Sequence, residues 1–250
     1  MIILKSSKEI MLMRAAGIIT ARALHAAGAA VEPGVSTLEL DRICYETIKQ
    51  NGAEPSCLGY EGYPNTACIS VNNRVIHGIP SGKEKLKEGD IVSIDVCAYI
   101  GGFHGDSAYT FTCGDVSPEA KRLLDATRTS MYEGIRAAKA GSRLGDVGSA
   151  VQRYVEARGY SVVREYTGHG IGASMHEDPS VPNFGRPGRG VRLQSGMVIT
   201  VEPMVNAGTA DIKVLGDGWT VITADGALSA HFEHTLAITD DGPVILTELD

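Results

Sequence analysis

The sequence predicts an α+β fold: a single domain, residues 1–250, built from two similar halves. Three observations support this. Turn glycines recur at an offset of 107 residues, so that Gly34 and Gly52 fall opposite Gly141 and Gly159. Apolar residues at helical spacing precede each second glycine. Segments with the alternation of strands follow the helices in each half. We therefore expect halves of about 1–114 and 115–250, in which helices cover antiparallel strands.

Two helices are expected in the first half. Ser6 and Glu9 have the spacing of a capping box, in which two side chains satisfy free backbone N–H groups, so a helix should begin after Ser6. A second helix is indicated by a helical stripe that stops at Gly52 and consists of Leu40, Ile43, Cys44, Thr47 and Ile48. Glycine often follows a last helical turn because it accepts a positive φ.

The second half repeats this arrangement. Ser117 followed by Pro118 is typical of an N-cap and a first helical residue, because proline lacks an N–H that would remain unsatisfied there anyway. A second stripe ends before Gly159 and consists of Val147, Val151, Tyr154 and Val155. Both halves are thus predicted to contain two successive helices.

A hairpin is predicted to bring two aspartates together. In residues 91–97 (IVSIDVC) the apolar residues at even positions share one face, and Asp95 lies on the other. Gly101 and Gly102 suit a two-residue turn with positive φ, which places Asp95 opposite Ala108 and diagonal to Asp106. Diagonal neighbours lie roughly 7 to 8 Å apart, a separation that two carboxylates converging on metal ions can span.

Three further polar residues are predicted to join them. Pro203 keeps Glu202 extended and ends its strand, and Glu233 should share a strand face with His231 and Thr235. The residues flanking His169 are glycines, which we interpret as allowing the backbone to come close to a metal or a substrate.

These side chains form the ligand set of a two-metal hydrolase. Asp95, Asp106, Glu202 and Glu233 balance the charge of two divalent cations, and His169 adds a nitrogen. Two ions about 3.5 to 4 Å apart can activate a shared water and polarise a carbonyl. Oxygen and nitrogen ligands without a thiolate suit manganese, iron or cobalt at least as well as zinc.

Composition argues against several other classes. The 250 residues are 43% hydrophobic and carry a formal net charge of -7, which favours a soluble globular domain over a nucleic-acid-binding protein. Residues 186–192 (RPGRGVR) are interpreted as a glycine and proline loop with scattered charge. We expect no transmembrane span and no signal peptide. Five cysteines without a CxxC pair indicate reduced thiols and a cytoplasmic location.

Five stretches in the same order resemble the methionine aminopeptidases of the short bacterial type I class: CLGYEGYPNTACISVNNRVIHGIP, IVSIDVCAYIGGFHGDSAYTF, YTGHGIGASMHEDPSVPNFG, MVITVEP and WTVITADGALSAHFEHTLAIT. The resemblance covers nearly the whole chain and implies the duplicated pita-bread fold. It also implies that Asp95 and Asp106 bind one ion, and that Asp106, His169, Glu202 and Glu233 bind the other. Asp106 and Glu233 would bridge the two ions.

The resemblance further implies roles for other residues. Glu202 would be the general base, His77 would lie near the scissile amide, and His176 would donate to the substrate carbonyl. The methionine pocket would be lined by Cys57, Tyr60, Tyr63, Cys68 and Trp219, with Met175 where many bacterial relatives carry phenylalanine. Core packing is the alternative for Cys57 and Cys68. Asn72 and Ser229 would help to form a monovalent cation site.

The implied reaction is removal of the N-terminal methionine from peptides and nascent proteins whose second residue is small and uncharged. Water activated by two divalent ions, of cobalt, manganese, iron, zinc or nickel, would attack the first peptide bond. The protein would act as a cytoplasmic monomer that associates transiently with ribosomes, without binding a specific nucleic acid or a membrane.

Three other functions are compatible with parts of the sequence. A prolidase uses the same five ligands but carries a large N-terminal domain. A peptide-binding module of the same fold would have lost ligands, and all five are present here. A carboxylate-bridged oxidase would place Glu-x-x-His pairs on helices, and the five ligands contain no such pair.

Overall fold

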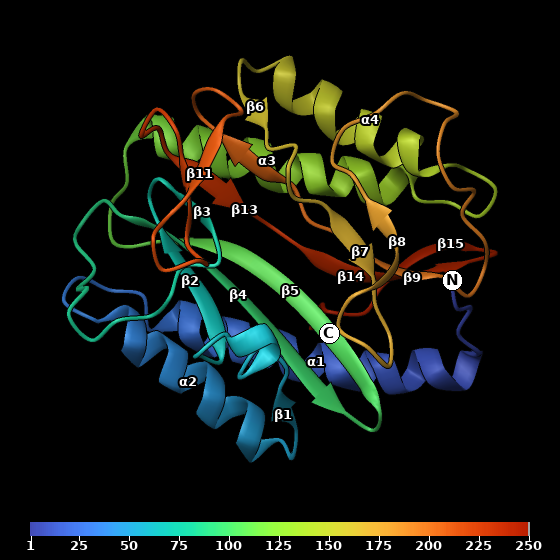
Figure 1. The fold of residues 1–250 in the computed structure, drawn as a ribbon, viewed down its shortest axis with the longest axis horizontal. Coiled ribbons are helices and arrows are strands. Elements are labelled where there is room, and N and C mark those ends of the chain that lie inside the picture. Colours follow the sequence, from blue (N-terminus) through green and yellow to red (C-terminus); the bar gives the residue numbers. More distant parts are fainter. Residues whose placement is uncertain (250) are drawn as a thin grey trace.

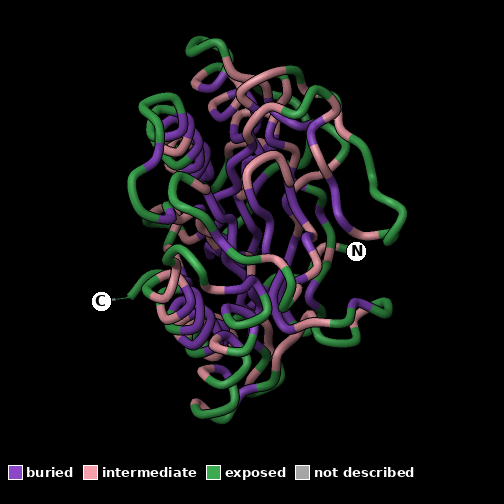
Figure 2. Tube along the Cα trace, turned by 90° about the vertical axis from the view of Figure 1, so that its left-hand side faces the viewer, coloured by how far each residue is buried: buried purple, intermediate pink, exposed green. Residues whose placement is uncertain are grey.

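Two pairs of helices cover a central set of strands. The computed structural model describes residues 1–249. In the ribbon, α1 and α2 lie along one edge of the molecule, α3 and α4 along the opposite edge, and the strands between them (Figure 1). Buried residues concentrate along the strands and on the helix faces that pack against them (Figure 2). The helices are α1 (Ser7–Ala29), α2 (Thr37–Gln50), α3 (Pro118–Ala137) and α4 (Leu144–Glu156), with a short 3-10 helix η1 (Tyr60–Gly62).

Within residues 1–249 the strands form four antiparallel sheets. The first contains β1 (Glu54–Pro55), β4 (Ile91–Ile100), β2 (Ala67–Val71) and β5 (Phe103–Thr112). The largest has the order β15 (Gly242–Ile245), β14 (His234–Thr239), β9 (Val198–Val201), β7 (Gly168–Gly170) and β8 (Glu177–Val181). One smaller sheet has the order β13 (Ser229–His231), β10 (Met204–Asn206) and β6 (Ser161–Val162). The other has the order β11 (Ile212–Val214), β12 (Val221–Thr223) and β3 (Arg74–Ile76). The predicted α+β class is confirmed.

The hairpin that carries the two aspartates has the predicted register. Asp95 on β4 pairs with Ala108, and Cys97 pairs with Asp106 on β5. Gly101 and Gly102 have φ values of 63° and 90°, as a two-residue turn of this kind requires. The alternate residues of β4 that face the helices belong to the core of the first half. Local turn chemistry therefore places both aspartates on the opposite face.

The predicted helix starts are also confirmed. Ser6 and Glu9 form a complete capping box, and the Ser117 side chain caps α3 with Pro118 in the first turn. In α2, Leu40, Cys44 and Ile48 are fully buried, whereas Tyr154 of the α4 stripe is only half-buried and carries Arg158 over its ring.

Several backbone features recur between the halves at the predicted offset. The Gly34 N–H donates to Leu86 O at 2.8 Å, and the Gly141 N–H donates to Leu193 O at 2.9 Å. The bridge between Ser36 and Lys85 likewise has a counterpart between Arg143 and Arg192. These pairs support our proposal of one domain with halves 1–114 and 115–250.

The residues around Glu233 differ from the sequence prediction. The expected continuous strand is interrupted at Phe232 and Glu233, between β13 and β14. Phe232 packs in the hydrophobic core formed mainly by the second half of the chain. The Glu233 N–H donates to Ala108 O on β5 at 2.8 Å. Glu233 therefore pairs with the first half of the chain instead of continuing its own ladder.

Helix α1 is the one helix of residues 1–249 that is long and apolar enough to cross a membrane, with 23 residues and a mean hydropathy of 1.2. The sequence prediction of no transmembrane span was made without considering this helix. In the structure 50% of the apolar 18-residue stretch of α1 is buried, and α1 packs against β4 and β5. Its apolar residues are thus used in contacts with the sheet.

The contact of α1 with the rest of the fold predicts a large effect of one added methyl group. A Cβ on Gly17 would lie 2.1 Å from the Leu246 carbonyl oxygen, which is backbone and cannot rotate away. We expect Gly17→Ala to lower the free energy of unfolding by about 1–3 kcal/mol, despite the better helix propensity of alanine.

Urea denaturation would measure this effect. Gly216→Ala is the control, because no atom lies within 4 Å of the added Cβ and the φ of Gly216 is not positive. Equal stability of the two variants would contradict the predicted steric clash.

Candidate metal centre and active site

One cavity of about 350 Å³ is lined by every residue that the sequence predicted for the divalent-metal centre, the catalytic groups and the methionine pocket. Its walls come from both halves of the chain. The predicted residues that line it are Cys57, Tyr60, Tyr63, Cys68, His77, Asp95, Asp106, His169, Met175, His176, Glu202, Trp219 and Glu233. Residues more than 170 positions apart in sequence therefore face one space.

The two aspartates of the hairpin both line this cavity, Asp106 buried and Asp95 half-buried. Burial raises the pKa of Asp95, and a hydrogen bond with Asp106 partly opposes that effect. Burial also raises the pKa of Asp106, with Asp95 and Glu202 adding negative charge nearby. Thr235 fixes the backbone here: its hydroxyl donates to Asp106 O at 2.7 Å and accepts the Asp106 N–H at 3.1 Å.

His169 presents one ring nitrogen to the carboxylates. Its Nδ1 lies 2.9 Å from Gly170 O, so that nitrogen carries the proton and donates to the carbonyl. Nε2 then has a free lone pair and lies 3.9 Å from Asp106 Oδ2 and 3.6 Å from Glu202 Oε1. Burial lowers the pKa of His169 to about 3, so the ring is neutral at pH 7. A neutral imidazole oriented by a second hydrogen bond is the usual form of a metal-binding histidine.

The glycines around His169 serve a different purpose from the one predicted. A Cβ on Gly168 would lie 2.7 Å from Thr200 O on β9, and one on Gly170 would lie 2.1 Å from Asp178 O on β8. The expectation that they admit a metal or a substrate was wrong. They allow β7 to pack closely between its two neighbouring strands, because any side chain would collide with backbone there.

Glu202 follows the end of β9 and is held by Thr200. The Thr200 hydroxyl donates to Glu202 Oε1 at 2.7 Å and accepts the His169 N–H at 2.9 Å. Asn183 Nδ2 donates to the Glu202 carbonyl at 3.0 Å. Burial raises the pKa of Glu202, Thr200 opposes this by donating to the carboxylate, and Asp95 adds to the rise.

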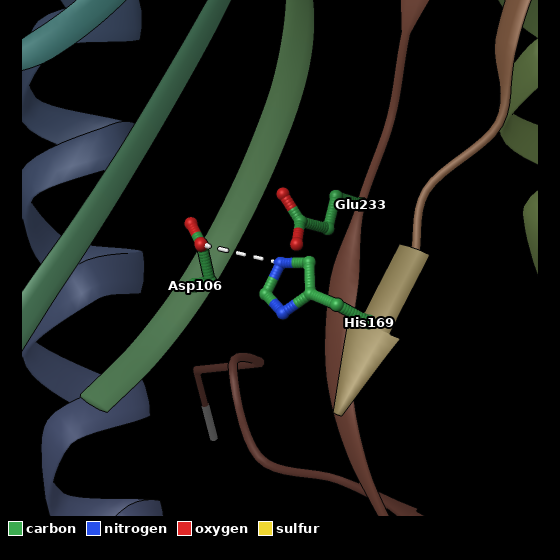
Figure 3. A group of neighbouring side chains, drawn as sticks. All are labelled: Asp106, His169 and Glu233. Carbon is green, nitrogen blue, oxygen red and sulfur yellow. Dashed lines mark ion pairs between the residues drawn. The ribbon is translucent and has the colours of Figure 1, made fainter. Parts of the chain in front are cut away.

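Glu233 completes the group from the break between β13 and β14. The side chains of Asp106, His169 and Glu233 point toward one another from three separate segments (Figure 3). One ligand atom from each of the three lies within 4.8 Å of the others. Ser107 Oγ donates to Glu233 O at 2.7 Å, which ties this segment to β5. Burial and the charge of Asp106 raise the pKa of Glu233.

The arrangement fits divalent cations. Asp106 Oδ1 and Glu233 Oε1 are buried and find no hydrogen-bond partner among residues 1–249. A buried acceptor without a partner is costly, and four neighbouring carboxylates repel one another. Cations bound between them would remove both costs. The available donors are carboxylate oxygens and one imidazole nitrogen, which suit a catalytic centre of transition-metal ions.

Two other histidines face the same space. His176 Nδ1 lies 2.9 Å from the Tyr60 hydroxyl, and its ring centroid is 4.4 Å from that of His169. His77 adopts a φ of 58°, uncommon for a residue other than glycine, and burial lowers its pKa to about 4. Edge contacts with Tyr166 and Trp219 support its ring. Both histidines are therefore fixed in place at the cavity wall.

The remaining predicted residues form an apolar wall. Tyr63 packs edge-on against Trp219 with centroids 5.1 Å apart, and its hydroxyl donates to backbone carbonyls. Burial raises the pKa values of Cys57 and Cys68 well above the ordinary range, so both thiols stay protonated. Met175 is 6% exposed. Sulfur and aromatic surfaces of this kind pack well against a thioether.

Part of the site was not predicted from the sequence. Glu61, Ile76, Tyr166 and Thr167 also line the cavity. Thr200 could have been found, because a residue two positions before Glu202 on an extended strand shares its face.

Three further residues that were named from the sequence do not line this cavity. His231, which was expected to share a strand face with Glu233, is 2% exposed, and its Nε2 lies 3.9 Å from Glu202 Oε2. The two residues suggested for a monovalent cation are adjacent: the Ser229 N–H donates to Asn72 O at 2.9 Å. They are absent from the residues that line the cavity.

Comparison with known families supports the sequence resemblance. The model of metallopeptidase family M24 matches residues 11–240. The chain belongs to this metallopeptidase family. A methionine aminopeptidase of Clostridium perfringens is 55% identical over 247 residues, with 99% of each chain covered, and methionine aminopeptidase 1 of Bacillus subtilis is 50% identical with 100% of each covered. The resemblance to methionine aminopeptidases is therefore confirmed for this M24 chain.

Solved structures confirm the pita-bread fold. The methionine aminopeptidase of Thermotoga maritima has a TM-score of 0.98 and 42% identity, and all of both chains is covered. The prolidase of Pyrococcus furiosus has a TM-score of 0.79 over 99% of this chain but only 66% of its own, at 24% identity. That second likeness concerns the fold alone.

The two hydrogen bonds of Thr200 predict an effect on metal binding by this M24 site. Thr200→Val keeps the shape of the side chain, but it leaves the His169 N–H without an acceptor and Glu202 without its donor. We expect the affinity for Mn²⁺ to weaken about 10- to 100-fold, the usual effect of losing a group that orients metal ligands.

Isothermal titration of the metal-free protein with Mn²⁺ measures this change. Thr112→Val, at an exposed position of β5, is the matched control. An unchanged affinity in Thr200→Val would show that Thr200 does not orient the ligands.

Proposed function

We propose that this M24 metallopeptidase is a methionine aminopeptidase, which removes an N-terminal methionine when the second residue is small and uncharged. The observation that supports it most is the convergence of five side chains of types that bind metal ions, beside an apolar wall of aromatic and sulfur-containing residues. Full-length similarity to methionine aminopeptidases supports the same activity.

The proposed ligands divide between two divalent cations. Asp95 and Asp106 would hold one, and Asp106, His169, Glu202 and Glu233 the other, with Asp106 and Glu233 shared. When bound, the ions supply a water of lowered pKa and polarise the substrate carbonyl. Cobalt, manganese, iron, zinc and nickel all suit these donors.

Glu202 is the proposed proton carrier. Thr200 holds its Oε1, which directs the carboxylate toward the other ligands. Burial raises its pKa, so the carboxylate is a stronger base than an exposed glutamate. It would accept the proton of the attacking water and deliver it to the amine that leaves as the peptide bond breaks.

The histidines and the apolar wall would position the substrate. His176, held by Tyr60, would donate to the carbonyl oxygen as negative charge develops there. His77 is neutral at pH 7 because burial lowers its pKa to about 4, and it would contact the scissile amide. Cys57, Tyr63 and Trp219 would surround the methionine side chain, whose thioether packs well on sulfur and rings.

Peptide hydrolysis by metal-free protein, titrated separately with manganese, iron, cobalt, zinc and nickel, tests the proposal. We expect metal-dependent release of methionine from Met-Ala-Ser and no cleavage of Ala-Pro-Ala. Cleavage before proline would favour a prolidase instead. Inactivity with every metal, in protein shown to bind it, would favour a peptide-binding module.

Location and partners are further parts of the proposal. We expect a cytoplasmic monomer that acts on nascent chains and associates transiently with ribosomes. Size-exclusion chromatography with light scattering tests the monomer. Cosedimentation with ribosomes translating a Met-Ala chain, compared with idle ribosomes, tests the association.

The role of Glu202 predicts a loss of turnover in Glu202→Gln. The amide keeps the shape and an oxygen for Thr200 but cannot accept the proton. We expect kcat for Met-Ala-Ser to fall by roughly 100-fold or more. The assay is run at saturating metal, with occupancy confirmed, because Glu202 is also a ligand. Glu165→Gln, at an exposed position, is the control. Near-normal turnover would remove Glu202 from the role of base.

A further inference from the structure

A buried ion pair joins the N-terminal segment to the loop that carries Met175 and His176. Lys5 Nζ donates to Glu177 Oε2, and the two side chains are only 4% and 9% exposed. Lysine and glutamate are rarely buried unless they are paired, because an isolated charge loses its hydration. Neither residue is part of the proposed chemistry, so another reason must account for the burial of both charges.

The lysine is anchored to the sheet that supplies His169. The Lys5 N–H donates to Gly196 O at 2.7 Å, and the Gly196 N–H donates to Ile238 O on β14 at 2.9 Å. Lys5 Nζ also donates to Ile3 O at 3.1 Å. Its ammonium group is thus fixed relative to the five-stranded sheet rather than free to follow the loop.

The glutamate organises the loop from within. Glu177 Oε1 accepts the Ser174 N–H at 3.2 Å, and the Gly172 N–H donates to Ser174 O at 3.0 Å. A Cβ on Gly172 would lie 2.5 Å from both Glu177 Oε1 and Lys5 Cε. Glycine at this position therefore allows the ion pair to lie directly against the loop backbone. One carboxylate links the anchored lysine to the turn of residues 172–177.

The same turn presents Met175 and His176 to the cavity. His176 precedes Glu177 in the chain, and both Met175 and His176 line the cavity. The loop is also tied to β5, since the His104 N–H donates to Gly172 O at 2.9 Å. A shift of Glu177 would therefore move the His176 ring relative to the ligands on β5 and β7.

We propose that Lys5, acting through Glu177, is a positioning residue that holds the loop of residues 172–177 so that His176 and Met175 face the substrate. The inference rests on the proposed aminopeptidase function for its assay. The loop contains none of the five proposed metal ligands, so the inference concerns the position of the loop and not the binding of metal.

The first test compares Lys5→Met with wild type. Methionine approximates the length of the lysine stem but leaves Glu177 without its partner. We expect kcat for Met-Ala-Ser to fall about 10- to 100-fold, the effect of a misplaced catalytic group. The Mn²⁺ affinity, measured by calorimetry, should not change. Lys8→Met, at an exposed position in the first turn of α1, is the control and should behave as wild type.

A double-mutant cycle separates positioning from general destabilisation. In a His176→Ala background, adding Lys5→Met should lower kcat by less than about twofold, because the group it positions is already gone. All assays run well below the melting temperature of each variant. Independent, multiplying losses would overturn the proposal, as would a normal kcat in Lys5→Met.

A second variant keeps the test decisive if Lys5→Met does not fold, as judged by circular dichroism. Glu177→Gln removes the charge that Lys5 recognises but keeps an oxygen for the Ser174 N–H, and we expect the same loss of kcat and the same cycle with His176→Ala. Unaltered kcat in Glu177→Gln would refute the role of the ion pair. An inactive wild type would instead refute the proposed function itself.

Discussion

The structure depends on holding four carboxylates together in one buried space. Burial raises the pKa values of Asp95, Asp106, Glu202 and Glu233, and repulsion by neighbouring carboxylates adds to the rise for the last three. Such a cluster persists only if the backbone around it is rigid and if cations complete it. Asp106, Glu202 and Glu233 are accordingly held by hydrogen bonds to the side chain or to the backbone of the residue, and two buried oxygens are left for a ligand.

The junction between the halves supplies this rigidity without a regular β ladder. Side-chain hydroxyls take the place of ladder hydrogen bonds: Ser107 donates to Glu233 O, and Thr235 bonds both backbone groups of Asp106. Because these bonds end on the ligand residues themselves, the relative position of the halves and the geometry of the centre are coupled. The ion pair of Lys5 and Glu177 extends the same principle to the loop that carries His176.

Features that depend on neighbours in sequence could be predicted. The Gly101–Gly102 turn fixes the register of β4 and β5, so the approach of Asp95 to Asp106 followed from local chemistry. The break at Phe232 and Glu233 could not be predicted, because it arises from a bond to Ala108 on a distant strand. The glycines beside His169 were misinterpreted for the same reason: the backbone that excludes a side chain there belongs to β8 and β9.

By itself the sequence determined which residues are the candidates for the chemistry, how the helices begin, and how the aspartate hairpin is registered, because residue type and short-range spacing decide those properties. Only the tertiary structure decided that Thr200 orients both His169 and Glu202, and that Lys5 lies buried against Glu177. The Lys5–Glu177 contact joins residues 172 positions apart. Local periodicity carries no information about such contacts, since they form only when separate elements pack together.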